Sequence, residues 1–395
     1  MAKGNFFLHE TKHINTPFNH VLPLVVGVMG VLAAIVLLFT SLGSNDIVTW
    51  NRFALEIQAF GLFQLYNSDP MFNHPPLMGL FAWVSLEVSM LFGVAFHIIF
   101  KSFMIFAHIA TAVLLRNIWS AKSSHRNALW VFAAFTWALS SILVAAFHGN
   151  TDTLIALFCL LVLYFIYQQK YGLAGIAFAL AFNVKIIPLI LFCPLLAGIR
   201  DKRNILLFGL GAAIGVIPYI ITWIGAGPAF IENIFGYGSN IVPWGIQLLL
   251  VLLDPFVQFE TTVPAYRTFG KLLIIALILL LSIIGYIRDW SPPVLTACAF
   301  IIFLIFAPGF GVQYIVYLTP IIFLISPLWG FIYAMLSGLF LGSIYYHFLT
   351  PEYPFQSVHN GNYSSISTII GLLVWYFLVL LLWKILSNKP SSTNK

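Results

Sequence analysis

The sequence predicts an all-α polytopic membrane protein with about 12 transmembrane helices, and two observations lead to this prediction. The chain has 395 residues, of which 61% are hydrophobic and only 8% are charged, whereas roughly a quarter of the residues in a soluble protein carry a charge. Many apolar runs also approach the ~20 residues that a helix needs to cross a hydrocarbon core ~30 Å thick. The sequence lacks the short alternating segments of a transmembrane β-barrel.

The first predicted span, 21–42, is followed by a long segment, 43–96, that we expect on the outer side of the membrane. Its apolar residues Ile47, Trp50 and Phe53 recur at helical spacing among polar residues. This pattern is typical of a helix that lies along the membrane interface. The first outer loop is therefore expected to contain interfacial helices.

The run 77–91 is apolar enough to span, but the charges beyond it favour another arrangement. If it crossed the membrane, the basic loop from Arg116 to Arg126 would face outside, against the positive-inside rule. We therefore expect 77–91 to lie on the outer surface, with 97–119 as the second span. Both termini are then cytoplasmic, as tails 1–20 and 388–395. The other predicted spans are 130–147, 153–168, 173–183, 186–199, 205–224, 271–287, 294–307, 313–325, 328–346 and 367–386.

The net charge of +6 does not indicate a nucleic-acid partner, because the basic residues lie in short loops between apolar runs. Such loops fix the orientation of a membrane protein. The three cysteines, Cys159, Cys193 and Cys298, lie inside apolar stretches without metal-ligand spacing. No metal site is expected from them.

The acidic residues gather on one side of the predicted topology. Of the twelve, only Glu10, Asp201 and Asp289 are expected on the cytoplasmic side. Asp46 follows the first span, and it could serve either as a helix N-cap or as a catalytic carboxylate. Asp152 could likewise cap the helix that starts at residue 153, and capping is the simpler interpretation there.

Lys185 stands away from every predicted cytoplasmic loop, and Pro188 shortly after it predicts a break in the helix. A lysine in this position either extends its ammonium group to the interface or neutralises an anion, of which a lipid phosphate is an obvious example. Gln313 and Tyr314 could join two helices or hydrogen-bond a sugar or phosphate. Tyr66 and His74 are open to the same two interpretations.

The order of four motifs resembles the GT-C glycosyltransferases, most closely the family 87 mannosyltransferases and the GPI mannosyltransferase 1 type. The motifs lie within residues 43–320: Asn45-Asp46-Ile47 after the first span; Gly61 to Tyr66 leading to His74-Pro75-Pro76-Leu77; Gly149-Asn150-Thr151-Asp152; and Asn183-Val184-Lys185-Ile186-Ile187-Pro188, with Gln313-Tyr314 later. Where the GPI enzymes carry an Asp-x-Asp pair, this chain has Asp46 and Val48. This departure from the family pattern argues against a metal-bridged mechanism and favours a single catalytic carboxylate, so we expect neither a metal nor a cofactor.

The resemblance implies a GT-C-like catalytic module over residues 21–320, followed by C-terminal transmembrane helices over 321–387. It implies an inverting transfer of a hexose, usually mannose, from a polyprenyl-phosphate donor. The acceptor would be a glycolipid, a glycan or a protein. The reaction would occur on the non-cytoplasmic face of a plasma membrane in a prokaryote, or of the endoplasmic reticulum in a eukaryote.

The same resemblance assigns roles to the motif residues. Asp46 would be the catalytic base, because an acceptor hydroxyl must lose a proton as its oxygen attacks the anomeric carbon. Lys185, Gln313 and Tyr314 would bind the donor phosphate, whose negative charge grows as it departs. The other expected substrate-binding residues are Asn45, Trp50, Tyr66, His74, His148, Asn150, Asp152 and Tyr237.

The main alternative is a polytopic transporter or lipid flippase without transferase activity. It would explain the spans and the isolated Lys185, but not the long outer segment 43–96. A membrane acyltransferase would require an intramembrane histidine with an acidic or amide partner, and neither His97 nor His108 has that spacing.

Overall fold

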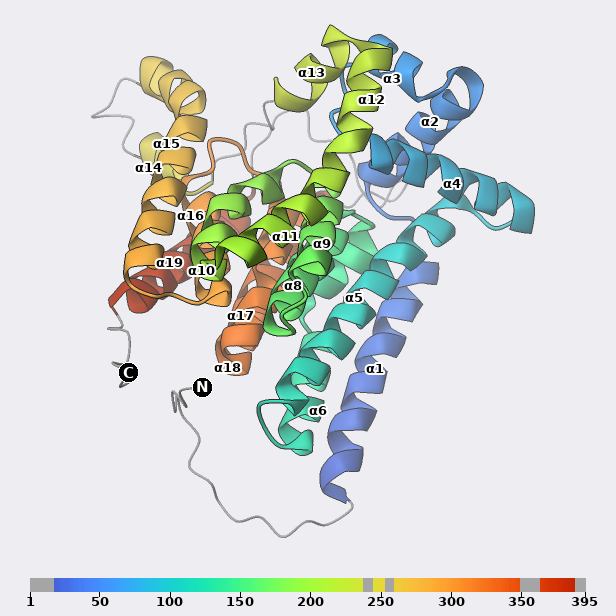
Figure 1. Ribbon diagram of the computed structural model, residues 1–395. Helices are drawn as coiled ribbons and strands as arrows, with labels where there is room; N and C mark the ends of the chain where they lie inside the picture. Colours follow the sequence, from blue (N-terminus) through green and yellow to red (C-terminus); the bar gives the residue numbers. More distant parts are fainter. Residues whose placement is uncertain (1–17, 237–243, 253–258, 349–362, 388–395) are drawn as a thin grey trace.

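The computed structural model describes residues 18–236, 244–252, 259–348 and 363–387, and within these ranges all regular secondary structure is helical. Figure 1 shows two long helices, α1 (Phe18–Thr40) and α5 (Phe96–Ser120), running alongside each other on one side of the molecule. Residues 1–17 of the predicted N-terminal tail, the predicted C-terminal tail 388–395 and the predicted site residue Tyr237 lie outside the described residues.

Six helical segments in the described ranges are long and apolar enough to cross a membrane, so the protein is membrane-embedded. One of them includes a short 3-10 helix, and another is only the apolar part of a longer helix. The segments are α1, α5, the continuous run α11 (Lys202–Ala213), η3 (Ile214–Val216) and α12 (Ile217–Ala226), the Thr268–Ile287 part of α15 (Phe259–Ile287), α18 (Pro327–Phe348) and α19 (Ser365–Ser387).

A seventh span is formed if one bent pair is counted as a single crossing. Helix α6 (His125–Thr136) is followed by α7 (Leu139–Ile142) and the π-helix η1 (Leu143–His148), with a bend of 49° at the break. The buried His108 of α5 bridges the break, because its Nε2 lies 3.4 Å from the carbonyl oxygen of Thr136 and its Nδ1 lies 2.8 Å from the Ser141 hydroxyl. The bent span ends at His148.

The predicted count of about 12 spans is not confirmed, because several predicted spans are shorter helices. A helix of 16 residues, such as α8, rises only about 24 Å, less than a hydrocarbon core of about 30 Å. Most of these helices are apolar because protein surrounds them. They are α8 (Asp152–Tyr167), α9 (Tyr171–Val184), η2 (Ile187–Leu191) with α10 (Phe192–Ile199), α16 (Pro292–Phe306), and η4 (Val312–Tyr317) with α17 (Thr319–Ile325).

The predicted first outer loop forms three helices that lie across one end of α1 and α5 (Figure 1). They are α2 (Asn45–Phe60), α3 (Leu62–Ser68) and α4 (Pro76–Phe92). Helix α4 packs against α2 and, with 17 residues, is one of the shorter apolar helices. Helix α13 (Pro228–Phe235) packs against α3, and α14 (Ile246–Leu252) packs against α15.

Helix α9 is fixed by an unusually close approach to α11. A Cβ atom on Gly211 would lie 2.2 Å from the carbonyl oxygen of Gly172, and one on Gly175 would lie 2.1 Å from the carbonyl oxygen of Phe208. Small residues let helix backbones come this close inside a membrane. Because α9 ends at Val184, this packing determines where Lys185 lies.

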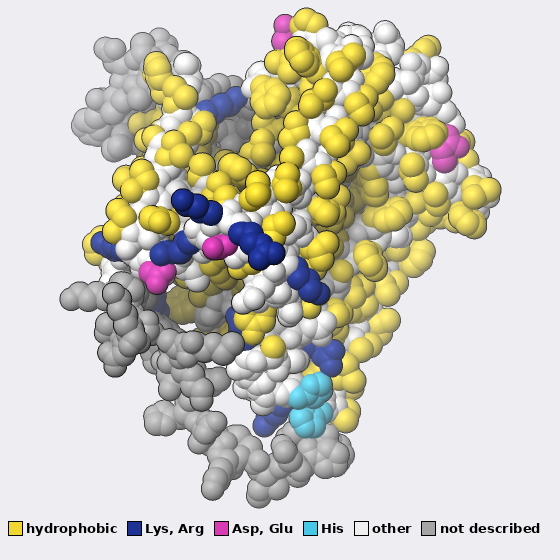
Figure 2. Space-filling view, in the orientation of Figure 1, with side chains coloured by type: hydrophobic (Ala, Val, Ile, Leu, Met, Phe, Trp, Pro, Cys, Tyr) yellow, Lys and Arg dark blue, Asp and Glu magenta, His cyan; other side chains and the backbone are white. Residues whose placement is uncertain are grey.

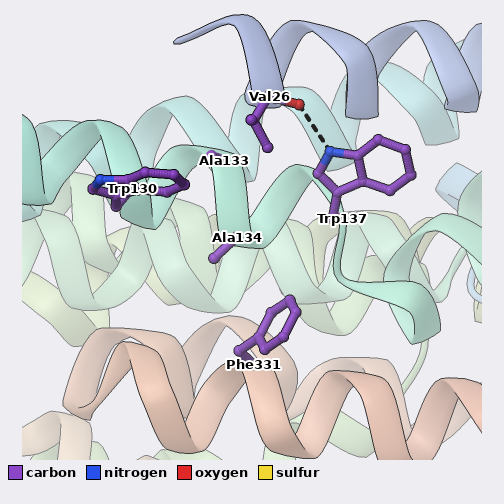
Figure 3. Close-up of a pocket in the computed structure, with 6 residues that line it drawn as sticks. All are labelled: Val26, Trp130, Ala133, Ala134, Trp137 and Phe331. Atoms are coloured by element: carbon purple, nitrogen blue, oxygen red, sulfur yellow. Dashed lines mark hydrogen bonds between the residues drawn. The ribbon is translucent and has the colours of Figure 1, made fainter. Parts of the chain in front are cut away.

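An apolar cavity of about 450 Å³ lies between α1, α6 and α18 (Figure 3). The indole nitrogen of Trp137 donates a hydrogen bond of 2.8 Å to the carbonyl oxygen of Val26 at one side of it. The cavity has no ionisable lining residue and therefore does not qualify as a catalytic site. Its lining residues are Val26, Trp130, Ala133, Ala134, Trp137 and Phe331.

Candidate active site

Asp46 lies in the first turn of α2, but its side chain is not the cap of that helix. Ser44 has extended backbone angles and its hydroxyl accepts a hydrogen bond of 3.1 Å from the backbone N–H of Asp46. This is the usual geometry of a serine N-cap. The structure therefore assigns capping to Ser44 and leaves the Asp46 carboxylate available for other contacts.

Two side chains from a distant turn hold the Asp46 carboxylate. The Nε2 atom of His148 lies 3.0 Å from its Oδ2, and the amide nitrogen of Asn150 donates to the same oxygen. Among the described residues, Oδ1 has no hydrogen-bond partner. The Asp46 side chain is 40% exposed while that of His148 is 6% exposed, so the aspartate presents one oxygen to the outside of the cluster.

The turn between η1 and α8 positions His148 and Asn150. Gly149 adopts a φ of +74°, and a Cβ atom there would lie 2.7 Å from Ile47 and 2.8 Å from Lys101. Only glycine adopts this backbone conformation without strain in so little space. The side-chain oxygen of Asn150 accepts a 2.9 Å hydrogen bond from the backbone N–H of Asp152.

The hydrogen bond between the Asn150 side chain and the N–H of Asp152 corrects the expectation that Asp152 caps α8. Asn150 bonds the N–H of Asp152, whereas the Asp152 carboxylate, fully buried, lies 2.7 Å from the ammonium group of Lys185. Tyr317 also lies close enough to interact with the Asp152 carboxylate, although outside standard hydrogen-bond geometry. Asp152 is therefore the counter-ion of Lys185.

Lys185 belongs to the site rather than to the membrane interface. Its side chain is only 14% exposed, and its ammonium group lies 5.1 Å from the ring centroid of Tyr314. The chain leaves the α9 helix at Lys185, which has extended backbone angles, and Pro188 is the second residue of the short helix η2. The extension to the interface considered above does not occur in this structure.

Tyr345 completes the support of His148. Its hydroxyl lies 2.7 Å from Nδ1 of His148, whose Nε2 faces Asp46. The contacts at both ring nitrogens fix the orientation of the imidazole, with Nε2 turned toward the Asp46 carboxylate.

The charges around Asp46 favour its ionised form. Burial acts to raise its pKa, but the hydrogen bond and charge of His148, the charge of Lys185 and the hydrogen bond of Asn150 together hold the pKa of Asp46 well below its usual value. Burial and the charge of Lys185 lower the pKa of His74 to about 3. At neutral pH the site therefore combines an anionic Asp46 with a neutral His74.

Two predicted substrate-binding residues, Trp50 and Tyr66, form a buried support around a third, His74. Trp50 is 2% exposed and its ring centroid lies 4.4 Å from that of His74. The Tyr66 hydroxyl donates a hydrogen bond of 2.6 Å to the backbone oxygen of His74. Trp50 and Tyr66 therefore position the His74 loop, while Nδ1 of His74 is buried without a partner among the described residues.

The remaining predicted residues are placed as follows. Asn45 is the first residue of α2, directly before Asp46. Gln313 precedes Tyr314 in η4, and its side chain forms no hydrogen bond within the described part of the chain. Searched over the same residues, the structure contains no group of three or more histidine, cysteine, aspartate or glutamate side chains that could hold a metal ion.

The profile of glycosyltransferase family 87 matches residues 72–308. The chain belongs to glycosyltransferase family 87. The family 87 match includes His74, His148, Asn150, Asp152 and Lys185, and it ends before Gln313 and Tyr314. Asp46 lies before its start, so the catalytic assignment of Asp46 depends on the geometry alone. A comparison with curated proteins found no significant match.

Membership of family 87 establishes a membrane glycosyltransferase, with an all-helical architecture that agrees with the GT-C type. Sequence reasoning missed Tyr345, because the C-terminal helices carry no motif and Tyr345 is 197 residues from His148. The only signal for it was a polar residue near the end of an apolar helix. No motif contains Tyr317 or Lys101, so sequence reasoning missed both.

Proposed function

We propose that the protein is an inverting glycosyltransferase that moves a hexose, most simply mannose, from a polyprenyl-phosphate donor to a hydroxyl acceptor. One observation carries the proposal: the partly exposed carboxylate of Asp46 lies in the same cluster as a cation, Lys185. A base and a phosphate-binding cation are the two groups that this reaction requires.

The reaction follows from these two groups. The acceptor oxygen attacks the anomeric carbon and forms the glycosidic bond as the bond from that carbon to the phosphate oxygen breaks. The acceptor proton passes to Oδ1 of Asp46, and the polyprenyl phosphate departs with the bonding electrons. Its growing negative charge is stabilised by the ammonium group of Lys185.

Because the pKa of Asp46 is low, the bound donor must also raise the basicity of this carboxylate. A carboxylate whose pKa lies far below the operating pH is a weak base. In the structure Lys185 contributes to this low pKa. A donor phosphate beside Lys185 would offset the positive charge and raise the basicity of Asp46, so the site would become a better base once the donor is bound.

His148 does not take the role of the base in this proposal. Its two ring nitrogens already contact Asp46 and Tyr345, and its side chain is almost completely buried. We assign it the orientation of the Asp46 carboxylate. The site lies at the end of α1 and α5 away from the basic loop between α5 and α6. The positive-inside rule supports a cytoplasmic position for that loop, and we propose that the site faces the opposite side.

The proposal is tested with purified protein in lipid vesicles, radiolabelled polyprenyl-phosphate mannose and a membrane glycolipid extract as acceptor. The expected result is transfer of label to glycolipid, with inversion at the anomeric carbon and without added metal. Nucleotide-linked mannose serves as the comparison donor and should give no transfer. Transfer from the nucleotide donor alone, or retention of configuration, would show that the proposed reaction is wrong.

A further inference from the structure

Lys101 is a buried cation that the reaction above does not use. It lies near the start of α5 and its side chain is inaccessible to solvent. Its ammonium group donates hydrogen bonds to the backbone oxygens of Ser41 at 2.7 Å, Leu37 at 3.1 Å and Leu38 at 3.5 Å. No carboxylate within the described ranges forms an ion pair with it.

The acceptors of Lys101 are the last carbonyl groups of α1 and the turn that follows. A helix leaves its final carbonyl oxygens without partners inside the helix, and they carry partial negative charge. An ammonium group has three N–H donors, and here each of them has an acceptor. Lys101 is therefore satisfied by backbone oxygens, and its contacts leave no donor for a substrate anion.

Ser41 connects this cap to both turns of the active site. Its hydroxyl donates to the backbone oxygen of Phe147 at 3.0 Å and accepts from the N–H of Gly43 at 3.1 Å. One residue later, the N–H of Ser44 donates to the backbone oxygen of His148 at 3.0 Å. The turn that leads to Asp46 and the turn that carries His148 are thus joined by the Ser41 hydroxyl and by the backbone N–H of Ser44.

The hydrocarbon part of Lys101 touches the second turn directly. A Cβ atom on Gly149 would lie 2.8 Å from Cγ of Lys101, so the lysine stem packs against the backbone between His148 and Asn150. One side chain therefore contacts both segments: its ammonium group contacts the segment before Asp46, and its stem contacts the segment that supplies the two partners of Asp46.

We propose that Lys101 is a positioning residue that aligns the Asp46 carboxylate with His148 and Asn150. This inference rests on the proposed role of Asp46 as the base. Lys101 acts through the geometry of the two turns, since its ammonium group contacts backbone oxygens of α1 and of the turn after it. A residue that only capped α1 would support the helix without affecting how Asp46 meets its partners.

The test measures kcat, the KM for polyprenyl-phosphate mannose and the pH dependence of kcat in Lys101→Met. Misalignment turns the Asp46 carboxylate away from the acceptor hydroxyl, so kcat should fall roughly tenfold, less than the 10²–10⁴ that complete loss of a general base costs, with KM within about twofold. The acid limb of the pH profile should move to higher pH. The groups that face Asp46 and shape this limb are His148, Lys185, Asn150, His74, Asp152 and Tyr345.

Ser41→Ala gives a second test if Lys101→Met does not accumulate. It removes the hydroxyl between the two turns while Lys101 stays, and it should lower kcat and move the acid limb in the same direction. The double variant should be no worse than the more impaired single variant, because both changes break one network. Ser102→Ala removes a hydroxyl from the same helix that bonds only within it, to Ile98, and should leave kcat unchanged.

Wild-type kcat and a wild-type acid limb in both Lys101→Met and Ser41→Ala would overturn the positioning role, as would an effect confined to KM. Asp46→Asn is measured in the same assay to separate this outcome from failure of the proposed function. If Asp46→Asn keeps wild-type kcat, the proposed base is wrong. If only Asp46→Asn loses activity, Asp46 remains the base and Lys101 does not position it.

Discussion

The two aspartates of the site have different surroundings and therefore different roles. The Asp46 side chain is 40% exposed and presents Oδ1 without a partner among the described residues, whereas Asp152 is fully buried against Lys185. A buried carboxylate that lies 2.7 Å from an ammonium group is poorly placed to accept a proton from a substrate. This difference supports the proposal that Asp46 is the base, whereas Asp152 is the counter-ion of Lys185.

Lys185 forms an ion pair with Asp152, and we propose that it also binds the donor phosphate; a pair of variants separates the two roles. Lys185→Met leaves Asp152 buried without its partner, which should destabilise the protein by about 3–5 kcal/mol. Asp152→Asn combined with Lys185→Met removes both charges and should recover most of this stability. The KM for the polyprenyl-phosphate donor should remain raised in both, as measured by thermal unfolding and initial rates.

The double variant decides between the two roles. If it recovers the donor KM together with stability, Lys185 does not contact the donor phosphate and serves Asp152 alone. Glu87→Gln is a suitable control, because Glu87 is bonded only by Gln58 in α2 and lies outside the cluster. It should change neither property.

The pH dependence of activity reports the contact between His148 and Asp46. The reaction requires ionised Asp46, whose pKa is held below its usual value by its partners. Wild-type activity should therefore be constant from neutral pH down past about 3.9, the usual pKa of an aspartate, and fall only at still lower pH. His148→Ala removes a contact that lowers this pKa, so its acid limb should lie at higher pH. An unchanged acid limb would contradict the assignment.

Sequence reasoning identified the members of the site but not how they pair. Asp46, Asn150, Asp152 and Lys185 were found from the order of the motifs, and the structure brings them into one cluster. His148 and Asp46 are 102 residues apart, and no local pattern encodes such a contact. Ser44, Asn45 and Asp46 all have side chains that can cap a helix, so only the structure shows that Ser44 is the cap.

At the scale of elements, the close packing of α9 against α11 is the feature that places Lys185. Gly211→Ala puts a methyl group against the backbone of α9 and should cost about 1–3 kcal/mol, the usual range for overpacking. Gly209→Ala on the same helix meets nothing within 4 Å, and should be neutral or slightly stabilising because alanine favours helix. Thermal unfolding of the two variants tests this difference. Equal effects would show that α9 and α11 do not pack so closely.

The long helices were predictable and the short ones were not. The predicted spans 21–42 and 97–119 agree with α1 and α5 to within a few residues, because a long uninterrupted apolar run has few alternatives. Helix α16 is apolar on every side because protein surrounds it, and its 15 residues gave the same pattern as a span. Apolar runs alone do not distinguish a helix buried in protein from one that faces lipid.

For the whole molecule, the distribution of charge predicts the orientation in the membrane. Figure 2 shows most of the visible lysine and arginine side chains in a band across the middle and lower part of this face, below a largely hydrophobic upper region. In a variant without its three native cysteines, Ala121→Cys should be labelled only from the cytoplasm and Ser68→Cys only from outside, because both positions are exposed. The opposite labelling would place the active site on the cytoplasmic face.

The central claim is that Asp46 is the catalytic base, and Asp46→Asn tests it most directly. The measurement is kcat for transfer from polyprenyl-phosphate mannose, alongside the affinity for that donor. The substitution keeps the size of the side chain and its contact with His148, so donor affinity should be nearly unchanged while kcat falls by about 10²–10⁴. Wild-type kcat in Asp46→Asn, with folding intact, would contradict the account.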